Sequence, residues 1–254
     1  MKIGLSLTFK RFSLDGKFHI EMVNKYLRYK PESFAWRKEV KGWKEKKWDE
    51  KKHKELIEGL SSSEPFILSS SDWNSFRVND VEAVKRPYQH FMIAQDAEVF
   101  NPANSEIEEI IAREGFSCAY LYDEKYESQQ SALCQNRVLE YKDSAFLWKI
   151  QLMKNAFLIK VYKILSPPGR SQVISSTDLL ACWKMWFGKE FYHIVPKERL
   201  LSFKDAYKIE LLANDVVYIQ LFEKVEDSST RKARRIQRKW RKWLDFDGLI
   251  KRHP

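Results

Sequence analysis

Near the amino terminus, apolar residues alternate with small or polar residues, and this pattern limits the local fold to a β-strand. The alternation runs from Ile3 to Lys10. Successive side chains of a strand point to opposite faces, so all the apolar members share one face. These members are Ile3, Leu5, Leu7 and Phe9. We therefore predict that the fold begins with a strand that has one buried face.

Helical and strand patterns then follow one another without regular alternation. Helices are predicted over residues 20–27, 50–60, 105–111 and 196–201, and after Asp80. Strands are predicted over residues 66–68, 116–122 and 156–165, and a hairpin over 208–212 and 216–222. This mixture favours an α+β class, with a mixed or antiparallel sheet and packed helices. We expect one domain over residues 1–254.

Two of the predicted helices have specific start signals. Ser105 and Glu108 have the spacing of a capping box, and Gly115 follows the apolar positions. Thr177 and Asp178 can cap a second helix, which Gly188 would end. The apolar stripe of that second helix would be Leu179, Leu180, Trp183, Trp186 and Phe187.

Composition excludes two classes of protein. A hydrophobic fraction of 44% with 14% aromatic residues is too high for a disordered chain. A mean hydropathy of −0.53 with 31% charged residues is too polar for a membrane-embedded chain. The first residues do not form the apolar region of a signal peptide, and Cys118, Cys134 and Cys182 show no CxxC spacing. These features predict a cytoplasmic protein with reduced thiols.

The net charge of +10 is distributed unevenly along the chain. Residues 1–60 hold 16 Lys and Arg against 9 Asp and Glu, and residues 230–254 hold 10 against 2. The intervening residues hold 19 against 24. The chain therefore has a basic amino-terminal segment, an acidic middle and a basic carboxy-terminal segment.

Residues 230–244 have the pattern of a basic amphipathic helix. Ala233, Ile236, Trp240, Trp243 and Leu244 recur at helical spacing, and Lys or Arg occupies most other positions. Such a helix can dock on the protein's own core. It can also serve as a calmodulin-type target, a membrane-surface anchor or a phosphate-binding arm.

The basic amino-terminal stretch carries tryptophans among lysines, which can stack on bases of single-stranded nucleic acid. Alternatively, the lysine stems cover a tryptophan-lined surface. Together with the carboxy-terminal helix, this stretch defines a candidate basic contact surface. Its residues are Trp43, Trp48, Arg234, Arg235, Arg238, Trp240, Arg241 and Trp243.

Catalytic motifs are absent from the sequence. It contains no GxGxxG, no GxxxxGK[ST], no GxSxG and no HExxH, and its five histidines are far apart. The nearest approach to a catalytic pair is Glu190 with His193, which would share a helix face. We therefore expect a non-enzymatic protein without a cofactor or metal site.

Several segments resemble bacterial immunity proteins of polymorphic-toxin systems. They are SDW (71–73), RVND (77–80), FNP (100–102), GFSCAYLYD (115–123), WKMWFGKEF (183–191) and PKER (196–199). The resemblance implies a non-enzymatic cytosolic protein that binds one cognate toxin and blocks it during bacterial competition. Such proteins are often acidic, which the middle of this chain matches. The candidate contact residues are Asp123, Glu124, Glu127, Trp183 and Trp186.

Two hypotheses follow, an immunity protein and a nucleic-acid-binding protein that uses its basic termini. Phosphate binding weakens steeply with salt, whereas a protein interface with an apolar core need not. Deletion of residues 230–254 is expected to abolish nucleic-acid binding and to preserve toxin binding.

Overall fold

The structure is a computed structural model that describes residues 1–10, 16–37, 43–60, 64–78, 88–132, 168–169, 171–174 and 177–252. The helix predicted after Asp80 and the strand predicted over residues 156–165 lie outside these ranges, as does Cys134. Within the described ranges, no helix combines the length and the apolar character needed to span a membrane.

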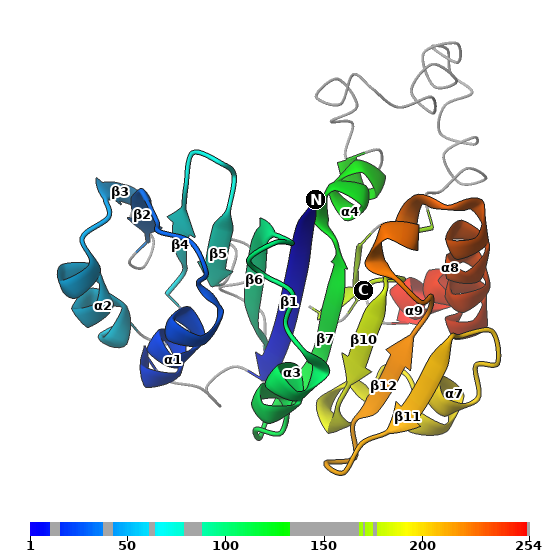
Figure 1. The fold of residues 1–254 in the computed structure, drawn as a ribbon. Helices are drawn as coiled ribbons and strands as arrows, with labels where there is room; N and C mark the ends of the chain where they lie inside the picture. Colours follow the sequence, from blue (N-terminus) through cyan, green and yellow to red (C-terminus); the bar gives the residue numbers. More distant parts are fainter. Residues whose placement is uncertain are drawn as a thin grey trace.

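The main structural element is a ten-stranded sheet in which every neighbouring pair of strands is antiparallel (Figure 1). In spatial order the strands are β11 (Lys208–Leu211), β12 (Val217–Gln220), β10 (Lys184–Phe187), β7 (Phe116–Asp123), β1 (Lys2–Lys10), β6 (Tyr88–Asp96), β5 (Ser75–Val78), β4 (Phe66–Ser69), β2 (Ser33–Trp36) and β3 (Lys44–Lys47). A separate small hairpin consists of β8 (Gln172–Ile174) and β9 (Thr177–Leu179).

Helices pack around this sheet and complete an α+β fold, which confirms the predicted class. They are α1 (Gly16–Tyr26), α2 (Glu50–Glu58), α3 (Asn104–Ile111), α4 (Glu124–Ala132), α7 (Lys197–Leu201), α8 (Arg231–Leu244) and α9 (Phe246–Arg252). Two 3-10 turns, η3 (Lys189–Phe191) and η4 (Val225–Ser229), lie in the second half of the chain. Figure 1 shows α1 and α2 near the β2–β5 part of the sheet and α7, α8 and α9 near the β10–β12 part.

Strand β1 lies in the middle of the sheet and is buried on both faces, not on one as the alternation predicts. Phe9 packs edge-on against Phe18 of α1, with ring centroids 5.6 Å apart. On the opposite face, Thr8 is also fully buried. The β8–β9 hairpin covers that face, since Thr177 Oγ1 lies 3.3 Å from Cys118 Sγ on the neighbouring strand. A polar residue can therefore lie inside because a second layer supplies its contacts.

The helix predicted from Thr177 to Phe187 does not form. The segment instead contains β9 and β10, and β10 pairs with β7 on one side and β12 on the other. A short apolar run fits a buried strand as well as a buried helix, and periodicity alone does not separate the two. Pairing with two distant strands decides in favour of the strand.

Helix α3 forms as predicted, but its predicted capping box does not. The helix begins at Asn104, and Ala103 occupies the cap position without a side-chain hydrogen bond. The Asn104 side chain instead accepts a hydrogen bond from Lys184 Nζ over 2.8 Å. Gly115, which was predicted to end this helix, does not cap it: the helix ends at Ile111 with Ala112 in the cap position. Gly115 lies in the turn that follows, with a φ of 79° that favours glycine.

Candidate partner-binding site

Helix α8 is docked on the core of this protein. Trp240 is completely buried, and its ring lies 5.1 Å from the Phe203 ring and 6.2 Å from the Phe187 ring. Gln237 donates from Nε2 to the Ala181 oxygen over 2.8 Å. The buried face of α8 is therefore Ala233, Gln237, Trp240 and Leu244. Trp240 belongs to the core, so its assignment to a contact surface is wrong.

Trp243 lies at the margin of the same helix and stays 41% exposed. Its Nε1 donates to the Arg199 oxygen over 3.0 Å, and the Arg199 guanidinium donates back to the Trp243 oxygen. These reciprocal hydrogen bonds fix the indole against the end of α7 while leaving part of it accessible.

The face of α8 opposite Trp240 presents a row of cations, which we call the basic stripe. It consists of Arg231, Arg235, Arg238 and Lys242, spaced four, three and four residues apart. All four are exposed, and none forms an ion pair with another residue that the structure describes. Arg234 and Arg241 lie beside the stripe and are less exposed, and Arg241 lies 4.2 Å above the Phe246 ring. The stripe is a regular array of positive charge on a fixed helix.

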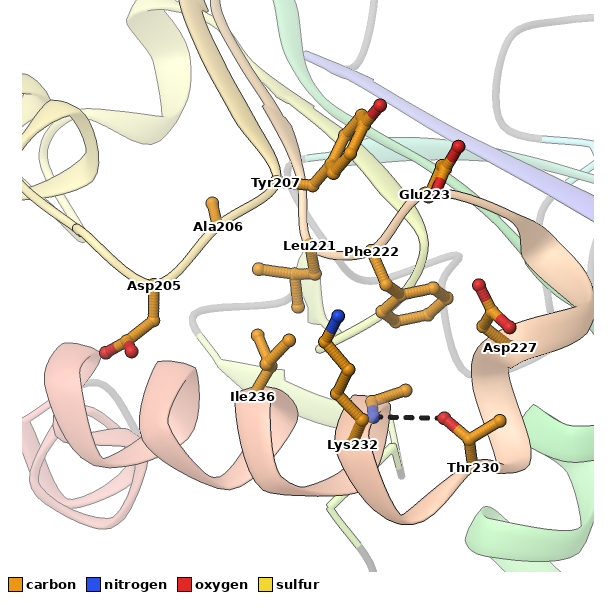
Figure 2. A pocket seen from close by; sticks show the side chains of 11 residues that line it. Asp205, Ala206, Tyr207, Leu221, Phe222, Glu223, Asp227, Thr230, Lys232 and Ile236 are labelled. Carbon is orange, nitrogen blue, oxygen red and sulfur yellow. Dashed lines mark hydrogen bonds between the residues drawn. The ribbon is translucent and has the colours of Figure 1, made fainter.

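A pocket of about 480 Å³ lies between α8, η4 and the segment that precedes β11 (Figure 2). Leu221, Phe222 and Ile236 form its apolar floor, and Asp205, Glu223 and Asp227 lie around the rim. None of the described residues that line it is a His or Cys. Its lining comes from separate segments, so no local sequence signal could have revealed it.

The amino-terminal basic segment does not join the basic stripe. Its β3 strand is the edge of the sheet opposite β11, and Figure 1 shows β3 and α2 at the far end of the molecule from α8. Trp43 is 39% exposed there. Trp48 is partly buried and packs 5.4 Å from His53. The two basic segments therefore form two surfaces, not one.

The predicted acidic residues lie at the junction of β7 and α4: Asp123 is the last residue of β7, and Glu124 and Glu127 are in the first turn of α4. Asp123 caps this helix, because its Oδ1 accepts a hydrogen bond from Tyr126 N over 3.0 Å. Burial raises the pKa of the Asp123 carboxyl above its ordinary value, although hydrogen bonds from the main chain of Lys125 and Tyr126 oppose this shift. Glu124 accepts from Ser128 Oγ over 2.8 Å, and Glu127 is partly buried on the same helix.

Further carboxylates lie at the same end of the sheet. Asp96 and Asp123 are the register partners of Lys2 and Ile3 at the start of β1. Lys2 Nζ donates to the Asp72 main-chain oxygen, which brings the β4–β5 turn to this end. We call this surface the acidic edge. Its members are Asp72, Asp96, Glu98, Asp123 and Glu124, and all are at least partly exposed.

The two tryptophans predicted to contact a partner are core residues. Trp186 is completely buried beside Tyr218, with ring centroids 5.2 Å apart. Trp183 is 8% exposed, and its Nε1 donates to the Glu223 oxygen over 3.2 Å. Trp186 has no exposed surface for a partner of the folded protein, so its assignment to a contact surface is wrong, and Trp183 offers very little.

Polar residues converge on the face of the central strands under the β8–β9 hairpin. Thr8 Oγ1 lies 3.2 Å from His90 Nδ1, and that nitrogen lies 4.0 Å from Asp178 Oδ2. Cys118 is adjacent, but burial raises the pKa of its thiol. A nucleophilic cysteine needs a lowered pKa and access to substrate. This cluster therefore has the properties of a structural network.

Glu190 and His193, the nearest approach to a catalytic pair in the sequence, lie at the 3-10 turn η3. Glu190 is within this turn, and His193 follows it. Glu190 pairs with Lys10, with Nζ and Oε2 3.7 Å apart, and His193 is exposed. Among the described residues, no group of three or more His, Cys, Asp or Glu could hold a metal ion.

Comparison with known proteins adds no assignment. No protein-family model matches the chain, and no curated protein matches it significantly.

Proposed function

We propose that this protein is a non-enzymatic interaction protein that binds and neutralises a cognate toxin, as an immunity protein of a polymorphic-toxin system does. The observation that carries the proposal is the acidic edge. It gathers residues from the β4–β5 turn, the end of β6 and the start of α4 at one end of the central strands. Such a surface is complementary to a basic patch on a toxin. We place this interaction in the cytoplasm.

The construction of the acidic edge favours binding over simple solvation. Asp123 is held by the α4 main chain and Glu124 by Ser128, so these side chains are ordered before a partner arrives. Preorganised groups lose less entropy on binding than mobile ones.

The proposal predicts a large secreted toxin encoded upstream of this chain's gene, and the test uses the carboxy-terminal domain of that upstream product, purified as an inactive fragment and titrated calorimetrically. The double variant Asp72→Asn, Glu98→Gln removes two exposed charges without changing side-chain size. We expect Kd to rise at least about tenfold, or about 1.4 kcal/mol. The difference should shrink between about 0.05 and 0.5 M salt, because exposed charges are screened. The matched control is Glu58→Gln, Glu226→Gln, which alters exposed carboxylates elsewhere.

The control variant should bind like the unsubstituted protein. Absence of binding by the unsubstituted protein would overturn the proposed function. Equal affinity of the acidic-edge variant and the control would remove the acidic edge as the contact surface.

A second candidate function is nucleic-acid binding, and the basic stripe is the observation that favours it. Its four exposed cations lie in one row on a docked helix, which suits contacts to successive phosphates. The variant Arg231→Gln, Arg235→Gln, Arg238→Gln should abolish binding to a labelled single-stranded RNA or duplex DNA. It should also flatten the dependence of affinity on salt. Deletion of residues 230–254 is unsuitable, because it removes the buried Trp240.

A further inference from the structure

The turn between β4 and β5 exposes a tryptophan almost completely. Trp73 is 85% exposed, whereas Trp36, Trp183, Trp186 and Trp240 are buried. Large apolar side chains that stay in water are a recognised property of interaction surfaces. Val99, which follows β6 at the same end of the sheet, is 53% exposed.

The backbone of Trp73 is also in an unfavourable conformation. Its φ of 61° lies in the left-handed region, which bulky residues rarely adopt. Glycine or asparagine would fill this turn position with less strain. Stability of the turn therefore does not explain a tryptophan at position 73, and strain of this kind is concentrated at functional sites.

Hydrogen bonds from three directions hold the turn in place. Within it, Ser70 N donates to Asn74 O and Trp73 N donates to Ser70 O, each over 3.1 Å. From β1, Lys2 Nζ donates to the Asp72 oxygen and, over 3.1 Å, to Asn74 Oδ1. From the start of β2, the Glu32 carboxylate accepts from Ser71 Oγ over 2.7 Å. Trp73 is thus presented on a rigid support.

We propose that Trp73 is the anchor of the toxin contact and inserts into an apolar pocket of the toxin whose rim is basic. This inference rests on the proposed function. Trp is the residue type most enriched among the side chains that dominate interface energies. Trp73 also lies beside Asp72, within the acidic edge.

Charge around the turn identifies the chemistry of the partner. The Glu32 carboxylate accepts from Ser71 at the turn, the exposed Asp72 belongs to it, and the Lys2 ammonium group donates to the Asp72 main-chain oxygen. With the other carboxylates of the acidic edge beside it, this surface suits a basic protein surface better than the phosphates of nucleic acid or of anionic lipid. The basic stripe, which would suit phosphates, lies at the other half of the sheet (Figure 1).

The test substitutes Trp73→Gly and measures binding to the same inactive toxin fragment. Glycine removes the indole and relieves the left-handed strain, so the melting temperature should stay unchanged or rise. Kd should nevertheless increase at least about a hundredfold, as expected for a central anchor. The matched control is Trp43→Ala, which removes an exposed tryptophan at the β3 end and should change Kd less than about threefold.

Each outcome has a separate meaning. If the unsubstituted protein binds the fragment and Trp73→Gly binds within about threefold of it, the anchor is overturned and the proposed function stands. If the unsubstituted protein does not bind the fragment, both the proposed function and the toxin as the partner of Trp73 are overturned. Three further measurements complete the test: self-association by sedimentation, binding to anionic vesicles and binding to single-stranded RNA. Loss of self-association, vesicle binding or RNA binding in Trp73→Gly would assign Trp73 to that partner instead.

Discussion

Gln237 of α8 donates a hydrogen bond from Nε2 to the main-chain oxygen of Ala181 over 2.8 Å, in a part of the core where neither residue reaches solvent. The same side chain accepts from the Tyr126 hydroxyl through Oε1 over 3.1 Å. One amide therefore joins α8 to α4 and to the segment before β10. Helix α8, which has a highly charged outer face, is fixed to the protein by this contact and by the buried Trp240.

Substitution Gln237→Leu tests the role of this amide. The change leaves the Ala181 oxygen and the Tyr126 hydroxyl without their partner, and burial of an unsatisfied polar group costs about 1–3 kcal/mol. We expect a loss of this size in the free energy of unfolding measured in urea. Arg238→Gln, on the exposed face of the same helix, should change stability by less than about 0.5 kcal/mol. A loss no larger than that of the control would show that apolar packing alone holds α8.

Substitution Trp240→Ala tests the packing of α8. Removal of a fully buried tryptophan leaves a cavity against Phe187 and Phe203 and should destabilise the protein by about 3–5 kcal/mol. Trp243→Ala is the matched control on the same helix. Because Trp243 is 41% exposed, its removal should cost clearly less in the same urea titration. Equal losses for the two variants would contradict the asymmetric docking of α8.

Thiol reactivity tests the character of Cys118 and Cys182. Both are buried, and burial raises the pKa of each thiol. In a Cys134→Ser background, we expect almost no reaction with an aromatic disulfide reagent at pH 8 until denaturant is added. Two thiols should then react. Rapid reaction of one thiol in the native protein would reveal an accessible thiolate and would reopen an enzymatic function.

Local signals predicted those elements whose sequence pattern matches their final environment. The helix from Arg231 to Leu244 formed with the predicted limits, and the alternation from Ile3 to Phe9 predicted the strand β1, although not its burial on both faces. The pattern failed where distant chain segments decide the structure. Within the apolar run from Leu179 to Phe187, the part from Lys184 onward became strand β10 because β7 and β12 pair with it. In α8, Gln237 occupies the buried face because Ala181 and Tyr126 supply its partners, while Ile236 lines a pocket.

The candidate site was predictable only in part. The strand predicted over residues 116–122 placed Asp123 and Glu124 at a strand end, and both lie at the accessible end of β7, where α4 begins. Trp183 and Trp186 were misplaced, since residue type alone does not separate a core tryptophan from a contact tryptophan. No local pattern indicated that Trp73 would have a left-handed backbone and remain exposed.

The pH dependence of stability tests the environment of Asp123. Burial raises the pKa of this carboxyl in the folded state above its ordinary value of about 3.9. The folded protein therefore holds this proton more tightly than the unfolded chain. The ionised carboxylate costs stability at neutral pH, and this cost disappears as pH falls through the folded-state pKa and below the ordinary value.

Asp123→Asn should consequently stabilise the protein at pH 7, because the amide oxygen still accepts from Tyr126 N while no charge is buried. The advantage should shrink in urea titrations as pH falls from 7 towards about 4, and it should be lost below that value. The matched control is Asp49→Asn, which caps α2 through a hydrogen bond to Lys52 N at an exposed site. It should gain no stability at pH 7, since Asp49 loses only a favourable interaction with the helix start. If the difference in free energy of unfolding between Asp123→Asn and the unsubstituted protein did not change with pH, burial would not be what sets the pKa of the Asp123 carboxyl.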